Sequence, residues 1–148
     1  MTEKTVAEQI AGNIMFKDAE HREFFVTHLP KCRYRDEYHA ALVYCLGIQA
    51  DTRKKAGEIY DFKSGCIRTE CLHGGWLTDE GAKAVRLAFS LYCSGTPSIH
   101  DYDDAKEQLT ECRLYAVDEL FASCHAKYFW QAVKLRYPGY CRKNDQGG

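Results

Sequence analysis

The stretch YHAALVYCLG at residues 38–47 carries the clearest structural signal in this sequence. Its apolar side chains recur at i, i+3, i+4, i+7 and i+8, the spacing of one helical face, and are Tyr38, Ala41, Leu42, Cys45 and Leu46. Gly47 follows directly and is a typical residue at the end of a helix. The pattern predicts an α-helix over residues 36–46 with its apolar face turned to a core.

Helical patterns continue on both sides of this segment. Asp18 is a suitable N-cap for a helix that Pro30 ends, and residues 51–61 show helical spacing again after the turn. Thr78 is the next suitable N-cap, and the long helix that it opens ends at Gly95. This helix has so wide an apolar surface that we expect it to be the central, most buried one.

The remaining segments complete a mainly α-helical prediction. Residues 1–15 give a weak helical pattern and should pack weakly, whereas residues 98–111 are acidic and indicate a loop or an exposed helix. The last helix is expected over residues 123–136 with Trp130 facing inward, and residues 142–148 are expected to form a disordered tail. Together the segments predict a single compact bundle of five or six helices.

Composition restricts the classes of function. With 148 residues, 45% hydrophobic and 28% charged, the chain has the balance of one globular domain over residues 1–148. The net charge of −1 disfavours a dedicated non-specific nucleic-acid binder, which usually has a basic excess. No segment approaches the ~18 apolar residues that span a bilayer, and residues 1–16 lack the apolar core of a signal peptide. We therefore expect a cytoplasmic protein without a membrane partner.

A glycine-rich loop at residues 63–77 holds the strongest local signal for a metal site. Cys66, Cys71 and His73 lie within eight residues, and the eight cysteines of the chain are expected to be reduced in the cytoplasm. Zinc prefers four thiolate or imidazole ligands in a tetrahedron, so these three predict a structural zinc site. The fourth ligand must come from elsewhere, and the candidates are Cys32, Cys141 and His100. Loop cysteines without a metal, or a redox pair, are the alternatives.

Binding is expected rather than catalysis. Trp76, in the same loop, is the large aromatic side chain that we expect either to anchor a partner or to cover the bundle. Cys124 and His125 are adjacent, so on a helix they point about 100° apart and are poorly placed to act as a nucleophile and its base. The sequence contains no phosphate-binding loop, nucleophile elbow or HExxH motif.

A helix–turn–helix is the alternative interpretation of the central segments. Helices over residues 36–46 and 51–61, joined at Gly47, have about the lengths of that motif. The second helix would begin near Thr52, and the three basic residues that follow Thr52 would then meet DNA. Basic residues early in an exposed helix are usually solvated, and the near-zero net charge further disfavours this DNA-binding regulator.

Several short blocks also look familiar together. They lie at residues 38–42, 59–62, 70–76, 85–89 and 132–138. The blocks resemble a family of small proteins without assigned function from clostridial genomes and their mobile elements, over roughly residues 16–140. The resemblance transfers no catalytic residues. Because small proteins of such elements include anti-CRISPR proteins, it implies a zinc-stabilised inhibitor that binds a bacterial defence nuclease such as Cas9 by protein–protein contact.

Overall fold

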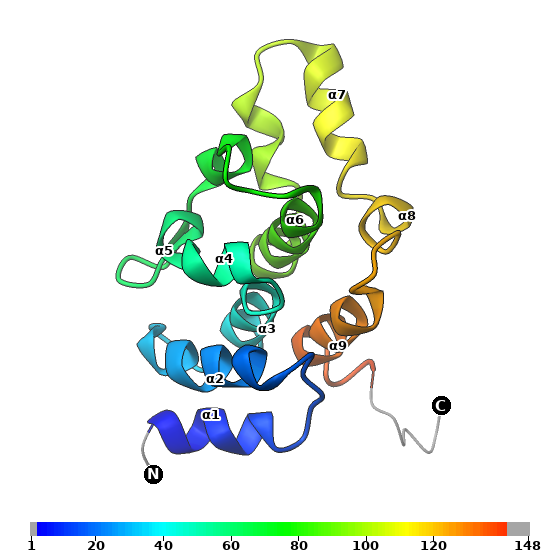
Figure 1. The fold of residues 1–148 in the computed structure, drawn as a ribbon. Helices are drawn as coiled ribbons and strands as arrows, with labels where there is room; N and C mark the ends of the chain where they lie inside the picture. The colour runs from blue at the N-terminus through cyan, green and yellow to red at the C-terminus, as the bar shows by residue number, and fades with distance from the viewer. Residues whose placement is uncertain (1–2, 142–148) are drawn as a thin grey trace.

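The computed structural model describes residues 3–141, and the predicted disordered tail at residues 142–148 lies outside them. Within residues 3–141 there are nine α-helices, three 3-10 helices and one two-stranded sheet (Figure 1). The predicted mainly α-helical class is confirmed. Six of the nine α-helices have nine or more residues, whereas the other three have only four or five and are too short to show a clear period. None of these helices has the length and apolarity needed to cross a membrane.

The elements follow one another in this order. The longer helices are α1 (Glu3–Ala11), α2 (Ala19–His28), α3 (Glu37–Leu46), α6 (Asp79–Cys93), α7 (Ala105–Arg113) and α9 (Ala126–Arg136). The short elements are η1 (Leu29–Lys31), α4 (Ala50–Lys54), α5 (Ala56–Ile59), η2 (Thr69–His73), η3 (Pro97–Asp101) and α8 (Val117–Leu120). Strands β1 (Tyr60–Asp61) and β2 (Cys66–Ile67) pair antiparallel, with Tyr60 opposite Ile67 and Asp61 opposite Cys66.

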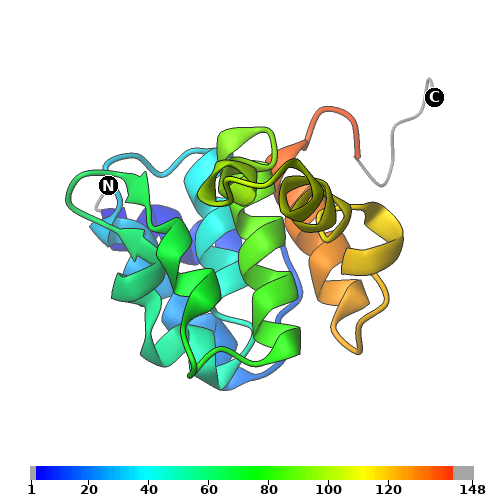
Figure 2. The same cartoon turned by 90° about the horizontal axis from the view of Figure 1, so that it is seen from above.

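The most buried helix is α3, and the expectation that the helix after Thr78 would hold this place was wrong. Every residue from His39 to Leu46 is buried, because α3 packs against α2, α6 and α9 (Figures 1 and 2). At its end, Gly47 lies so close to α2 that a Cβ there would be 2.8 Å from His21 Cδ2 and 2.9 Å from Phe24 Cδ1. A glycine therefore permits the close approach of α2 and α3.

The N-caps predicted at Asp18 and Thr78 are in place, whereas the helix expected to begin near Thr52 begins at Ala50 with Gln49 as its N-cap. Asp18 Oδ1 accepts a hydrogen bond from the His21 backbone N–H at 2.8 Å, and Thr78 Oγ1 accepts one from the Gly81 N–H at 3.0 Å. The left-handed residue that ends α6 is Ser94, with φ of 58°, one residue before the predicted glycine.

Several predicted boundaries and environments differ in the structure. The helix expected over residues 51–61 is divided into α4 and α5, because Lys55 leaves the helical conformation with φ of −109° and ψ of 24°. Trp130 is 49% exposed rather than in the core. Within the described residues of the N-terminal segment, α1 packs against α2 and contributes Ala7 and Ala11 to the core.

The polar segment after α6 is largely ordered as helix. η3, α7 and α8 together span residues 97–120, which we call the acidic arm. α7 lies at the end of the molecule farthest from α1 (Figure 1). The acidic arm therefore presents a surface separate from the α1–α3 side of the bundle.

Candidate functional site

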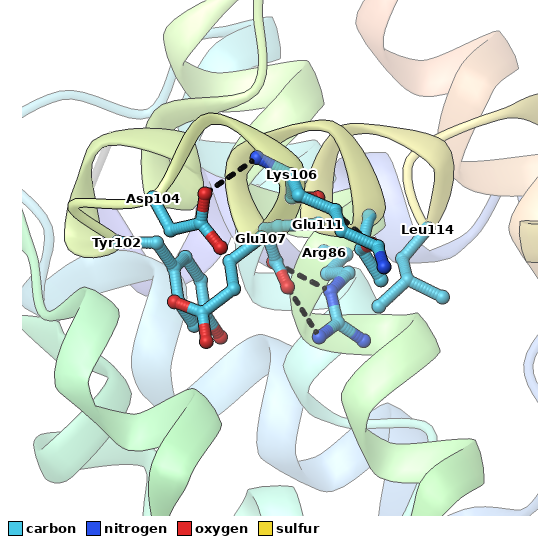
Figure 3. Close-up of a pocket in the computed structure, with 8 residues that line it drawn as sticks. Arg86, Tyr102, Asp104, Lys106, Glu107, Glu111 and Leu114 are labelled. Atoms are coloured by element: carbon cyan, nitrogen blue, oxygen red, sulfur yellow. Dashed lines mark hydrogen bonds and ion pairs between the residues drawn. The ribbon is translucent and has the colours of Figure 1, made fainter.

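A cavity of about 490 Å³ lies between α6 and the acidic arm (Figure 3). Arg86 of α6 and Tyr102, which follows η3, line it together with side chains from α7 and its two ends. Glu107 and Asp104 stand at the side where Tyr102 lies, and the Arg86 guanidinium faces the Glu111 carboxylate (Figure 3). Charged groups of both signs thus surround the cavity.

A buried polar network fastens the acidic arm to the bundle. Glu111, only 3% exposed, accepts hydrogen bonds from Arg86 Nε at 2.9 Å and Arg86 Nη2 at 3.1 Å. The Ser98 hydroxyl donates to the same carboxylate at 2.6 Å and lies 2.7 Å from the Tyr115 hydroxyl. Burial raises the pKa of Tyr115 to about 12, so its phenol stays protonated. The network links α6, η3 and the end of α7 through one carboxylate.

The outer surface of the acidic arm is strongly negative. Seven acidic and two basic residues occur in it, and six of the acidic ones are exposed, namely Asp101, Asp103, Asp104, Glu107, Asp118 and Glu119. Among the side chains that the structure describes, no cation forms an ion pair with any of these six. The arm carries −5 while the whole chain carries −1, so the rest of the chain carries a net +4.

Two exposed apolar side chains accompany these charges. Leu109 of α7 is 55% exposed and Val117 of α8 is 73% exposed. Apolar groups left in water on an ordered surface are available for contact with a partner. The acidic arm therefore combines charge with exposed apolar area.

The predicted zinc ligands lie on two small elements of the former loop, with Cys66 in β2 and both Cys71 and His73 in η2. Residues 60–67 form the β1–β2 hairpin, in which Cys66 is exposed, and Cys71 is buried in η2. Burial raises the pKa of the Cys71 thiol to about 12. His73 makes an edge contact with the Tyr102 ring at 5.5 Å between centroids.

The candidates for a fourth ligand are dispersed as well. Cys32 is buried near α2, where its thiol donates to the His28 carbonyl at 3.8 Å, whereas His100 is exposed on η3 and Cys141 lies after α9. No group of three or more His, Cys, Asp or Glu side chains in the described part of the chain is arranged to hold a metal ion. The residues present thus do not assemble the expected donor set there, and zinc stays a prediction.

Trp76 lies half-buried against the core and separates two depressions. One, of about 280 Å³, is lined by Cys71 and η2, and the other, of about 350 Å³, by Lys54 and Lys55. The indole packs over Gly74, where a Cβ would be 2.6 Å from Trp76 Nε1. Of the two roles expected for Trp76, this packing favours a cover for the bundle.

The segment considered for DNA binding uses much of its polar surface within the fold. The Thr52 side chain is buried and donates to the Leu46 carbonyl at 2.7 Å, and Arg53 Nη1 donates to the Gly47 carbonyl at 2.8 Å. Lys55 pairs with Glu58 at 3.2 Å. This geometry supports a DNA-reading helix less well than the sequence pattern does, because a recognition helix needs exposed side chains.

Cys124 and His125 have separate partners. The Cys124 thiol donates to Glu80 Oε1 at 3.3 Å, and this contact raises the thiol pKa. His125 Nε2 lies 2.9 Å from Gln49 Oε1. Since a nucleophilic cysteine needs a lowered pKa and a base within reach, this arrangement favours a structural role for both residues.

The acidic arm and its buried pair were not identified as a site from the sequence. Arg86 and Glu111 are 25 residues apart, and a charged side chain in a helix is usually expected to be solvated. The available signal was the imbalance of seven acidic against two basic residues over 97–120.

Comparison with known proteins gives one family match. Residues 11–148 match the model of a family of unknown function, DUF6075. No curated protein and no solved structure matches the sequence. The match confirms the coarser part of the resemblance, a family without assigned function. Because it covers almost the whole sequence, the chain belongs to the DUF6075 family.

Proposed function

We propose that this protein binds another protein through the acidic arm, and that the partner is a bacterial defence nuclease such as Cas9, which it inhibits by contact. The observation that carries the proposal is the charge of the acidic arm, −5, with six exposed carboxylates between residues 101 and 119. Enzymes of the Cas9 type hold their nucleic acids in positively charged channels. Charge complementarity of this kind speeds association and favours the correct partner.

The apolar side chains on the arm support the same proposal. Long-range attraction steers two proteins together but is weakened by salt, so a lasting complex also needs apolar area removed from water. Leu109 and Val117 supply such area next to the charges. The network around Glu111 holds both residues on ordered helices, which limits the conformational entropy lost on binding.

The choice of a defence nuclease rests on the resemblance to small proteins of mobile elements. Contact inhibition, rather than modification of the nuclease, is proposed because the most reactive residue types near each other, Cys124 and His125, are held by other partners. No step in the proposal depends on zinc.

A titration of Cas9 cleavage tests the proposal. With both proteins above the dissociation constant, residual cleavage should fall linearly and reach its minimum near one inhibitor per nuclease. If a small fraction of inhibitor silences a large excess of nuclease, the mechanism is turnover and contact inhibition is wrong. If Cas9 and the inhibitor neither bind nor affect each other, the proposed partner is wrong.

A further inference from the structure

The outer face of α9 carries cations and an aromatic ring in alternation, at a place that the proposed function does not use. Lys127, Trp130 and Lys134 are three and four residues apart, so they lie on one side of the helix. Lys127 and Trp130 are exposed and Lys134 is half-buried. α9 contains no acidic residue, and its buried apolar side chains Phe129 and Ala132 lie on the opposite face, whereas the buried Gln131 borders Lys127 and Lys134.

Aromatic rings extend this face beyond the end of the helix. The Tyr137 and Tyr140 rings lie 6.5 Å apart, and Tyr140 is 89% exposed. We call Lys127, Trp130, Lys134, Tyr137 and Tyr140 the α9 row. At 1.5 Å per residue, the helical distance from Lys127 to Tyr137 is roughly 15 Å.

One buried arginine fixes the end of the α9 row. The Arg136 guanidinium lies 4.5 Å from the Tyr137 ring centroid and 3.6 Å from that of Tyr38, which comes from α3. Arg136 Nε also donates to the Leu91 carbonyl at 2.8 Å, in the last turn of α6 where carbonyls lack helical partners. Tyr38, 37% exposed, is thereby held close to Tyr137 as a further ring at the surface.

A cavity of about 490 Å³ lies beside the α9 row. Its walls include Ile14, Leu135 and Pro138, and Lys134 stands in its lining. The segment before α2 is held there because Gln131 Oε1 accepts a hydrogen bond from the Met15 N–H at 3.3 Å. A flat apolar group can enter between the apolar walls of this cavity while a charged group attached to it stays near Lys134.

We infer that the α9 row binds single-stranded nucleic acid. Trp130, Tyr137 and Tyr140 would stack on exposed bases, and Lys127 and Lys134 would contact phosphates. Aromatic rings interleaved with cations are typical of surfaces that hold single strands without sequence preference. The 15 Å of helix would accommodate about four nucleotides stacked at 3.4 Å each.

The distribution of charge supports this occupant. The net charge of −1 disfavours nucleic-acid binding by the chain as a whole, but without the acidic arm the chain carries +4. A single strand fits the rings better than a duplex, whose base faces are already covered by stacking. The inference is independent of nuclease inhibition, because it uses none of the residues of the acidic arm.

Tryptophan fluorescence tests the inference directly, since Trp76 and Trp130 are the two tryptophans of the chain. In a Trp76→Phe variant excited at a wavelength that only tryptophan absorbs, the emission comes from Trp130. Adding oligothymidylate of about 15 nucleotides should quench this emission as bases stack on the indole. With two phosphate contacts the affinity should fall roughly sevenfold between about 50 and 200 mM salt.

Matched variants locate the surface. Lys127→Ala with Lys134→Ala should remove most of the salt dependence, and Trp130→Ala, followed with a labelled oligonucleotide, should weaken binding at least about fivefold. The control is Lys54→Ala with Lys106→Ala, two exposed lysines on α4 and α7 that should leave binding unchanged. Circular dichroism confirms that each variant is folded.

Four outcomes would overturn the inference. The first is no binding up to about 100 µM oligonucleotide at low salt, and the second is tighter binding of a duplex than of a single strand. The third is a polyglutamate peptide that binds as tightly as the oligonucleotide. The fourth is a control variant that loses as much affinity as the α9 variants. Loss confined to the control variant would place the nucleic acid on α4 or α7. Each of these results leaves the Cas9 titration unaffected.

Discussion

Replacing Glu111 by Gln should loosen the acidic arm, because the Glu111 carboxylate is the centre of the buried polar network that links the arm to α6. The change keeps the size of the side chain and removes its charge. Arg86, with 13% of its side chain exposed, would lose an ionised partner that it now contacts through two nitrogens at 2.9 and 3.1 Å. The Ser98 hydroxyl would keep only a neutral acceptor.

The expected loss follows from this geometry. Removing one partner of a fully buried ion pair costs about 3–5 kcal/mol. Arg86 lines two cavities and so can regain some water, which reduces the expected loss to about 2–3 kcal/mol. For a chain of this length that corresponds to a melting temperature lower by roughly 5–10 °C.

Urea unfolding followed by circular dichroism measures the free energy, and limited proteolysis reports whether the arm opens. The control is Glu107→Gln, on the same helix and cavity but exposed, which should change stability by less than about 0.5 kcal/mol. An equally small effect of Glu111→Gln would refute the reasoning. Replacing Arg86 and Glu111 together by Met and Leu should recover much of the loss, because no buried charge is then left without a partner.

Three further predictions concern His21, Gly47 and zinc. Burial lowers the pKa of His21 from 6.5 to about 4, so the unfolded chain binds a proton at this histidine more readily than the folded chain does. The contribution of neutral His21 to the free energy of unfolding is complete above pH 6.5 and should fall by about 3 kcal/mol as the pH decreases to 4. Urea unfolding at both pH values should show this slope in the wild type and a smaller one in His21→Gln, and titration of the His21 ring near pH 6.5 by NMR would contradict it. Gly47→Ala should destabilise the fold by about 1–3 kcal/mol, because its Cβ would come within 2.8 Å of His21, whereas Gly57→Ala, with no atom within 4 Å, should be neutral or stabilising in the same assay. Elemental analysis of purified protein tests the zinc prediction: one zinc per chain that is lost in Cys66→Ser supports it, and a metal-free wild type ends it.

The long helices could be predicted because local chemistry determines where they begin. Asp18 and Thr78 cap the first turns of α2 and α6 with their own side-chain oxygens, so sequence alone locates these starts. Which helix lies at the centre depends instead on packing from several sides. The burial of residues 39–46 of α3 arises from contacts with α2, α6 and α9, and the helical period of one segment does not reveal these contacts.

The environment of Trp130 shows a second limit of sequence patterns. α9 has large apolar side chains on more than one face, and the buried face turned out to be that of Phe129 and Ala132. The solvent side of α9 carries Lys127, Trp130 and Lys134 at helical spacing. This spacing was a sequence signal for the α9 row, but Trp130 was assigned to the core instead. The Arg86–Glu111 pair gave no signal, because its helices come together only in the folded chain.

The central claim, that the acidic arm inhibits a nuclease by contact, is tested most directly by reversing charges on the arm. The inhibition constant against Cas9 is measured for Asp118→Lys with Glu119→Lys and for a control with the same charge change, Glu8→Lys with Glu23→Lys, on the exposed surfaces of α1 and α2. The arm variant should inhibit at least about tenfold more weakly, with less salt dependence, and the control should match the wild type. Equal inhibition by the two variants would contradict the account.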